Sequence, residues 1–164
     1  MSSVAPPPPI VLSAAGASDL DEVMLVMVAA FPPDFGEGWT RSQCAGILPM
    51  SGVTLTLARD SASGLAQGFS LLRTVADEAE LLLVGVTPAR RRCGIGRALV
   101  DHFITHAKAR GAVRLHLEVR DGNAAVGVYH AAGFVPTGRR SNYYRGRDSI
   151  TYDALTLVYT ISGS

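Results

Sequence analysis

The chain has 164 residues, of which 48% are hydrophobic and 18% are charged. This length fits one domain, and the composition excludes a largely disordered chain. The formal net charge of +1 creates no field that would favour binding to nucleic acid or to an anionic membrane. We therefore expect a single domain over residues 10–164, behind a disordered, proline-rich tail over residues 1–9.

Cysteine content and the N-terminus indicate where the protein works. Cys44 and Cys93 lie far apart in the sequence, and a chain of this size needs no disulfide. The first nine residues contain no basic residue and no apolar run, so they are not a secretory signal. The longest apolar stretch, residues 23–31, is too short to span a bilayer. We expect a cytoplasmic protein that is a monomer or a weak dimer.

Residues 10–50 predict one strand and two helices. The strand covers residues 10–14, and Ser18 is the expected N-cap of the next helix, which ends before Pro32. Thr40 and Gln43 have the spacing of a capping box and predict a second, short helix. The expected buried face of the first helix follows helical spacing: Leu20, Val23, Met24, Met27, Val28 and Phe31.

The rest of the chain predicts an α/β domain. Glycines at positions 111 and 133 are expected to end its two later helices. Strands are expected over residues 53–59, 65–75, 80–86, 113–120, 134–137 and 151–161, and helices over residues 96–110 and 123–132. A polar loop is expected between the last two strands. The element order is therefore β-α-α-β-β-β-α-β-α-β-β, which predicts a mixed sheet of about seven strands.

Two of these strands form a βαβ unit. Residues 80–86 are almost continuously apolar, as in a strand that is covered on both faces. Residues 113–120 alternate, with Leu115 and Leu117 on one face and His116 and Glu118 on the other. Because a helix connects the two strands, we expect them to be parallel.

An arginine- and glycine-rich loop precedes the helix of this unit. It reads Arg91-Arg92-Cys93-Gly94-Ile95-Gly96-Arg97. Glycines let the backbone turn sharply, and the free N–H groups at a helix N-terminus attract anions. Arginine side chains add charge for a phosphorylated ligand. The sequence therefore predicts an anion site, with a flexible turn and solvated arginines as the alternative.

Other kinds of functional site at this loop and the helix after it match the sequence less well. A dinucleotide fingerprint requires glycine at position 99, where the chain has Leu99, and a P-loop requires Lys-Ser/Thr where the chain has Arg97-Ala98. His102 and His106 have metal-compatible spacing, yet no third ligand is evident, so we expect no metal. Cys93 lies at a helix N-terminus but has no histidine partner that would make it a nucleophile.

The loop, placed after Val84-Gly85-Val86, resembles the pyrophosphate loop of the GCN5-related N-acetyltransferase (GNAT) superfamily. Residues 117–123, Tyr129 and Gly133-Phe134 resemble its RimI-type branch, which acetylates the N-terminal alanine of a small-subunit ribosomal protein. Residues 31–40, 77–81 and 139–144 add to the likeness, which spans residues 10–161. The resemblance implies a strongly twisted sheet with helices on both faces, and acetyl-coenzyme A as cosubstrate.

The resemblance also implies roles for particular residues. Glu118 matches the general base, and Tyr129 matches the acid that protonates the departing thiolate. Tyr143 and Tyr144, in the expected polar loop, would help to shape the acceptor site. The residues that match the cofactor-binding positions are Val84, Gly85, Val86, Arg91, Arg92, Cys93, Gly94, Ile95, Gly96, Arg97 and Asn123. Read without the resemblance, Glu118 is a solvated strand carboxylate and Tyr129 a core aromatic beside Phe134.

The chain departs from the family pattern in two places. The segment from Asn123 to Tyr129 is one residue shorter than usual, and Ser141 interrupts the Arg-Arg-Asn-Tyr-Tyr pattern. A residue lost within the helix would rotate all later helical positions by about 100°. A residue lost from the preceding loop would displace Asn123 and leave Tyr129 in place.

Three functions are compatible with these features. The first is acetylation of a protein N-terminal α-amine, and the second is acetylation of a small-molecule amine. The third is a non-catalytic module that binds coenzyme A. For the first, the arginines over residues 139–147 would repel a basic acceptor unless acidic residues line the opposite wall, for which Asp34, Glu37, Asp77 and Glu78 are candidates.

Overall fold

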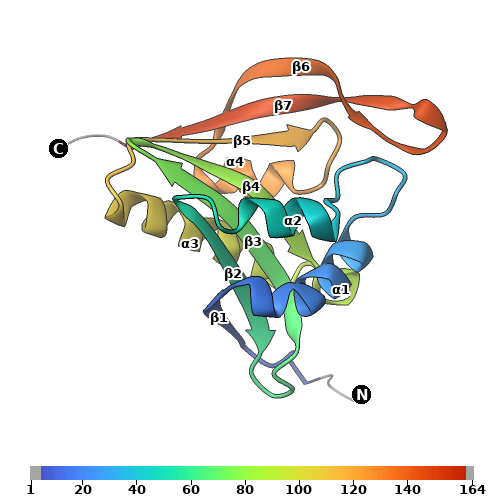
Figure 1. Ribbon diagram of the computed structural model, residues 1–164, viewed down its shortest axis with the longest axis vertical. Helices are drawn as coiled ribbons and strands as arrows, with labels where there is room; N and C mark the ends of the chain where they lie inside the picture. The colour runs from blue at the N-terminus through green and yellow to red at the C-terminus, as the bar shows by residue number, and fades with distance from the viewer. Residues whose placement is uncertain (1–4, 162–164) are drawn as a thin grey trace.

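The computed structural model describes residues 5–161, which form one seven-stranded mixed sheet with helices on both faces (Figure 1). The strands lie in the order β1-β2-β3-β4-β5-β7-β6. Their bounds are β1 (Ile10–Ala15), β2 (Val53–Asp60), β3 (Ala66–Val75), β4 (Glu78–Val86), β5 (Arg114–Arg120), β6 (Val135–Arg145) and β7 (Thr151–Thr160). The α-helices are α1 (Leu20–Ala30), α2 (Arg41–Ile47), α3 (Ile95–Ala109) and α4 (Val126–Ala132). The predicted fold class and element order are confirmed.

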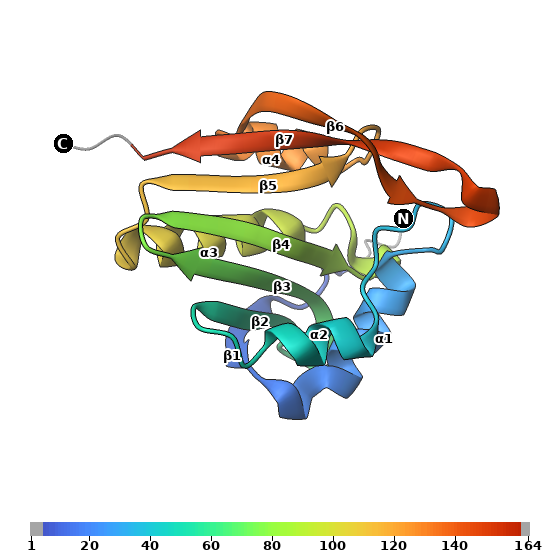
Figure 2. The ribbon, with the colours of Figure 1, turned by 45° about the horizontal axis from the view of Figure 1, so that its top comes forward.

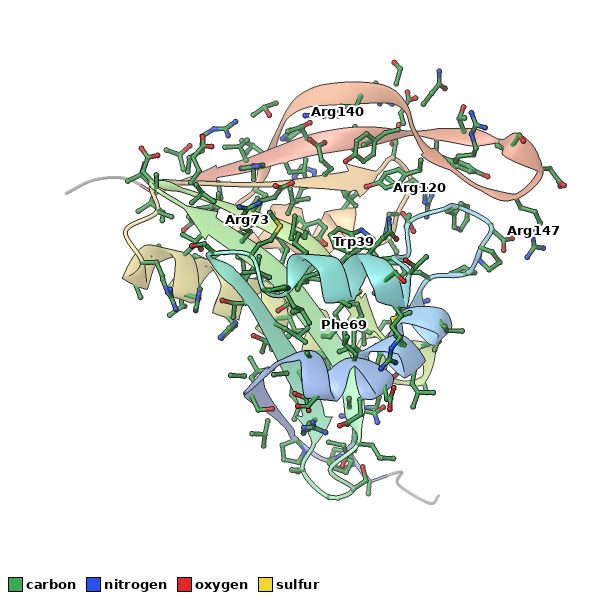
Figure 3. All side chains as sticks on the ribbon, viewed as in Figure 1. Trp39, Phe69, Arg73, Arg120, Arg140 and Arg147 are labelled. Atoms are coloured by element: carbon green, nitrogen blue, oxygen red, sulfur yellow. The ribbon has the colours of Figure 1, made fainter. Side chains whose placement is uncertain are left out.

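The helices bury apolar residues on the two faces of the sheet. In Figure 1, α1 and α2 lie in front of the sheet, and α3 and α4 lie behind it. The core on the α3 side includes Phe103, Leu115, Leu117 and Phe134, all at most 1% exposed. The core on the α1 side is built around Phe69 (Figure 3). The predicted capping box of Thr40 and Gln43 is present, and the predicted glycines follow the ends of α3 and α4, where Gly111 and Gly133 have φ angles of 86° and 110°.

The parallel strands β4 and β5 pair along only part of their length. Their register runs from Glu78↔Arg114 to Leu81↔Leu117. Directly after this point, the pairing of β4 with β3 shifts at Leu82, as in a β-bulge. A bulge bends its strand and increases the local twist. Beyond Leu81, β4 stays paired with β3 alone while β5 stays paired with β7, so each has an unpaired edge facing the other (Figure 2).

The start and the buried face of the first helix differ from the prediction. Ser18 is not the N-cap, because the Asp19 carboxylate accepts the N–H of Gly16 at 2.9 Å and closes a 3₁₀ turn over Ala17–Asp19. Val28 is 73% exposed, whereas Val26 is buried. The helix is apolar on almost every side, so spacing alone did not identify the face that packs on the sheet.

The expected polar loop between the last two strands is largely strand. β6 extends to Arg145 and pairs with β7 through Arg140↔Ala154 and Tyr144↔Tyr152. The pairing is interrupted near Asn142, whose φ is 53° and whose N–H donates to Asp153. β6 is an edge strand and is exposed along almost its whole length, so it lacks the apolar alternation that identifies a half-buried strand.

The expected tail falls partly on described residues. Residues 1–4 lie outside them, and residues 5–9 are neither helix nor strand. The carbonyl groups of Pro8 and Pro9 accept hydrogen bonds from Arg90 and from the N–H of Ser61, both at 2.9 Å. Cys44 and Cys93 are both free thiols. No helix within residues 5–161 is long and apolar enough to cross a membrane.

Candidate active site

The unpaired edge of β4 contains the three predicted residues Val84, Gly85 and Val86. Val84 and Val86 pack toward α3, while Gly85 faces the α1 side. There the rings of Phe69 and Phe31 lie directly over Gly85. The edge of β4 that turns away from β3 therefore offers backbone N–H and C=O groups to a ligand lying between β4 and β5.

Replacing Gly85 with alanine is expected to destabilise this edge. An added Cβ would lie 2.7 Å from Cε1 of Phe69 and 3.1 Å from Cε2 of Phe31. The free energy of unfolding should fall by about 1–3 kcal/mol, as in other overpacked cores. Chemical denaturation measures this loss. Gly46→Ala is a matched control, because nothing lies within 4 Å of a Cβ at that position. A fully stable Gly85→Ala variant would contradict the packing.

The loop before α3 presents free backbone N–H groups. Arg92 and Gly94 have left-handed φ angles of 62° and 82°. α3 begins at Ile95 with no side-chain cap and no acidic residue in its first turn. Over residues 5–161, no hydrogen-bond acceptor is found for the N–H groups of residues 93–97. The 15-residue helix adds its dipole at the same place. A diphosphate therefore fits this loop.

The arginine side chains of this region do not act alike. Nη2 of Arg91 donates to the carbonyl oxygen of Ala30, at the end of α1, at 2.9 Å. Nε of Arg97 pairs with Asp101 one helical turn away at 2.9 Å. Arg92 and Cys93 are exposed. A phosphate contact by Arg92 would therefore break no existing ion pair, whereas the side chain of Arg91 is already bonded to the end of α1.

Glu118 lies on the face of β5 that α3 does not cover. Its side chain is only 12% exposed, and each carboxylate oxygen has one partner. Oε1 pairs with Nε of Arg140 at 3.0 Å, and Oε2 accepts the hydroxyl of Thr156 at 2.7 Å. A carboxylate has about four acceptor sites, so Glu118 retains capacity for an amine proton. It is held in one orientation and is not a freely solvated carboxylate.

Tyr129 is 7% exposed and lies inside the regular part of α4. Its ring packs edge-on against Phe134 with centroids 6.1 Å apart, so it is also a core aromatic. Burial raises the pKa of Tyr129, and the negative charge of Glu37 raises it further. The hydroxyl is therefore protonated at neutral pH, which is the state that a proton donor requires.

Glu37, in the segment between α1 and α2, connects three elements of the site. Its Oε1 accepts Nε of Arg120 at 2.8 Å and Nδ2 of Asn123 at 3.0 Å. The side chains of Glu37 and Arg120 (the latter labelled in Figure 3) are 9% and 12% exposed. The Arg120 guanidinium carbon lies 3.7 Å from the centroid of the Phe35 ring. Asn123 Oδ1 accepts the N–H of Ala125, so both ends of its amide stabilise the turn before α4.

Tyr143 and Tyr144 lie on β6 rather than in a loop. Tyr144 points back to the site, where its hydroxyl donates to the carbonyl oxygen of Glu118 at 3.4 Å, while Tyr143 is 49% exposed. Burial raises the pKa of Tyr144, with smaller contributions from Tyr143, Glu37, Glu118 and Tyr129. Glu118, Tyr129 and Tyr144 therefore share one electrostatic environment.

The two histidines with metal-compatible spacing lie side by side on α3. The rings of His102 and His106 lie 5.8 Å apart, and burial lowers the pKa of His106. No group of three or more metal-ligating side chains occurs in the described part of the chain. His116 shares the face of Glu118, and its Nε2 lies 3.7 Å from Glu80.

Sequence reasoning missed the partners that orient these groups. Arg120 and Thr156 gave no signal, because a strand arginine and a strand threonine are ordinary surface residues. Glu37 was expected only as a member of an acidic wall. The register Glu118↔Thr156 would have pointed to the threonine, but pairing of strands distant in the sequence is not readable from spacing.

Comparisons with known proteins agree with this geometry. The sequence profile of the acetyltransferase (GNAT) family matches residues 22–134. The chain is 39% identical over 101 residues to the [ribosomal protein bS18]-alanine N-acetyltransferase of Escherichia coli (strain K12), covering 61% of this chain and 68% of that protein. It is 43% identical over 82 residues to the N-alpha-acetyltransferase RimI of Mycobacterium tuberculosis, covering 48% and 50%.

Solved structures have the same architecture. The ribosomal-protein-S18-alanine N-acetyltransferase from Escherichia coli aligns with a TM-score of 0.82 at 29% identity, over 94% of this chain and 96% of that chain. NAA60 of Arabidopsis thaliana shares the fold, with a TM-score of 0.80 at 18% identity over 94% and 99%. GNAT enzymes use acetyl-coenzyme A as the acetyl donor. With its family profile matched over more than half of its length, the chain belongs to the GNAT family of N-acetyltransferases.

Proposed function

We propose that this protein transfers the acetyl group of acetyl-coenzyme A to the N-terminal α-amine of a protein, with an alanine-initiated ribosomal protein as the first candidate. Its relatives from Escherichia coli act on the alanine of ribosomal protein bS18. The observation that carries the proposal is the juxtaposition of free amides at the start of α3, an unpaired edge on β4, and the oriented carboxylate of Glu118 on β5.

The N–H groups of residues 93–97 would hold the diphosphate, and the backbone of Val84, Gly85 and Val86 would align the pantetheine arm along the β4 edge. Acetyl-coenzyme A, when bound there, supplies an activated thioester. The chain itself supplies Glu118, which lies on β5, one of the two strands that border this opening, on the face of the sheet opposite α3. Asn123 acts through the turn before α4, since both ends of its amide are already bonded.

Glu118 would accept the proton that the attacking amine releases, directly or through one water. An α-amine has an ordinary pKa of about 7.7–8.0, against about 10.4 for lysine, so deprotonating it costs about 3–4 kcal/mol less. One carboxylate is sufficient for such an acceptor. Tyr129 would donate its hydroxyl proton to the sulfur as the C–S bond breaks and the N–C bond forms, with no covalent enzyme species.

Tyr129→Phe is expected to lower kcat about 10- to 100-fold, because the departing thiolate then takes its proton from water. The Km for acetyl-coenzyme A should change little. Phenylalanine keeps the edge-on packing of this ring against Phe134, so the melting temperature should stay within a few degrees of the wild type. Steady-state kinetics and a thermal melt measure both. An unchanged kcat would show that Tyr129 is a core aromatic only.

The charged side chains around the proposed acceptor site are mostly paired with one another. Arg139 pairs with Asp121 and Asp153, Arg140 with Glu118, and Arg147 with Asp34. These pairs neutralise most of the arginines whose repulsion the sequence predicted. The acceptor therefore meets a nearly balanced surface, because Asp34 and Glu37 are themselves paired with Arg147 and Arg120.

An acceptor screen tests the proposal. Peptides that begin with alanine should be acetylated at the α-amine, and the same peptides with a blocked N-terminus and a free lysine should not. Mass spectrometry identifies the modified amine. Turnover of polyamines, amino acids or other free amines without turnover of any peptide would assign the enzyme to small-molecule acceptors and overturn the proposal.

A further inference from the structure

The arginine directly before the cofactor loop, Arg90, is bound by the protein itself. Its Nη1 donates to Oδ2 of Asp60 at 2.8 Å, and its Nη2 donates to the carbonyl oxygen of Pro8 at 2.9 Å. The side chains of Arg90 and Asp60 are 12% and 11% exposed. The charge of Arg90 is thus already paired in a nearly buried place.

The other half of this pair is equally well fixed. Asp60 ends β2, and its Oδ1 accepts the N–H groups of Ala62 and Ser63 at 2.8 and 3.0 Å. Backbone hydrogen bonds from Ser63 and Ala62, together with Arg90, lower the pKa of Asp60. The carboxylate therefore joins the turn between β2 and β3 to the start of the cofactor loop.

The loop is also held at its next residue. Arg91 donates to the carbonyl oxygen of Ala30 at the end of α1. Beyond these two anchors, Arg92 adopts a left-handed conformation with a φ of 62°. A non-glycine residue in this region is strained and persists only where the surrounding structure enforces it. The two anchors fix the chain on the side of β4, together with the hydrogen bonds that Thr87 donates to Gln67.

We infer that Asp60 and Arg90 are a positioning pair, which holds the loop so that the N–H groups of residues 93–97 point together at a diphosphate. Arg90 is not a phosphate contact in this arrangement. The inference rests on the proposed function in that the ligand is coenzyme A. It assigns to the turn between β2 and β3, remote from the reacting groups, a role in cofactor affinity.

A positioning role for Arg90 and a direct phosphate contact predict opposite effects of Asp60→Asn on coenzyme A affinity. If Asp60 and Arg90 position the loop, Arg90→Gln and Asp60→Asn should each weaken coenzyme A binding about tenfold, and the double variant should be no weaker than either single one. If Arg90 contacted a phosphate, Asp60→Asn would release its guanidinium and tighten binding. Calorimetry with coenzyme A on the full chain measures all three variants, and tighter binding by Asp60→Asn would overturn the inference.

Hydrogen exchange without any ligand gives an independent readout. Both single variants should speed amide exchange over residues 91–97, and unchanged exchange would overturn the inference even if affinity falls. Failure of the wild-type chain to bind coenzyme A would instead refute the proposed function, and exchange would still decide the role of the pair. Arg90→Lys, which retains one donor for Asp60, should recover part of the affinity and rules out misfolding as the cause.

A second arginine–carboxylate pair is the matched control. Arg59 Nη2 pairs with Glu22 Oε1 at 3.0 Å and joins β2 to α1, and its Nη1 donates to the carbonyl oxygen of Gly64 in the turn between β2 and β3. Glu22→Gln removes the charge pair and leaves the bond to Gly64 in place, so it should leave coenzyme A affinity within about twofold of the wild type. An equal loss in this variant would assign the effect to general loosening of the sheet and would also overturn the inference.

Discussion

Glu118→Gln is expected to lower kcat by about 10²–10⁴, because the amide cannot accept the proton of the attacking amine. The Km for acetyl-coenzyme A should be nearly unchanged, since its proposed contacts lie on β4 and at the start of α3. Glutamine keeps the shape of the side chain and can still accept the hydroxyl of Thr156. Steady-state kinetics with an alanine-initiated peptide, at several pH values, measures the loss.

The control for this variant is Glu78→Gln, which removes a half-exposed carboxylate paired with Arg114 at the far end of β4. It should retain wild-type kcat. Wild-type kcat in Glu118→Gln would remove Glu118 as the base. If coenzyme A bound tightly while neither Glu118→Gln nor Tyr129→Phe changed the rate, the chain would be a binding module rather than an enzyme of this mechanism.

The elements that could be predicted from the sequence are those with a local cause. The capping box of Thr40 and Gln43 and the terminating Gly133 act within a few residues, and so does the alternation in β5. The loop before α3 was predictable for the same reason, because its glycines and the helix after them are adjacent in sequence. Glu118 and Tyr129 required the family resemblance in addition, since single residues of these types occur on many strands and helices.

The features that could not be predicted depend on contacts between distant residues. The side chain of Arg91 bonds to the end of α1, and that of Arg90 bonds to the end of β2. Each pair is too far apart in the sequence for a rule on residue spacing to predict the contact. Pairing with β7 converts a polar segment into the strand β6. The role of Glu37 is defined only when the segment between α1 and α2 lies against β5.

Breaking the ion pair between Glu37 and Arg120 is also expected to have a large effect. Arg120→Met should lower the free energy of unfolding by about 3 kcal/mol, because it leaves the Glu37 carboxylate nearly buried without its cation. The stacking of the guanidinium on Phe35 is lost as well. Since these contacts fix the segment between α1 and α2 beside the proposed acceptor site, the Km for the peptide should also rise. Denaturant titration and kinetics measure the two effects.

A double variant distinguishes the lost pair from the lost packing. Glu37→Gln combined with Arg120→Met removes both charges, and replacing a buried ion pair by neutral groups is often close to neutral for stability. The double variant should therefore be more stable than Arg120→Met alone, although it retains the defect in peptide Km. Arg114→Met is the control on the same strand, because its pair with Glu78 is half-exposed and should contribute less than about 1 kcal/mol. A double variant that is less stable than Arg120→Met would show that packing, rather than the unpaired carboxylate, dominates the loss.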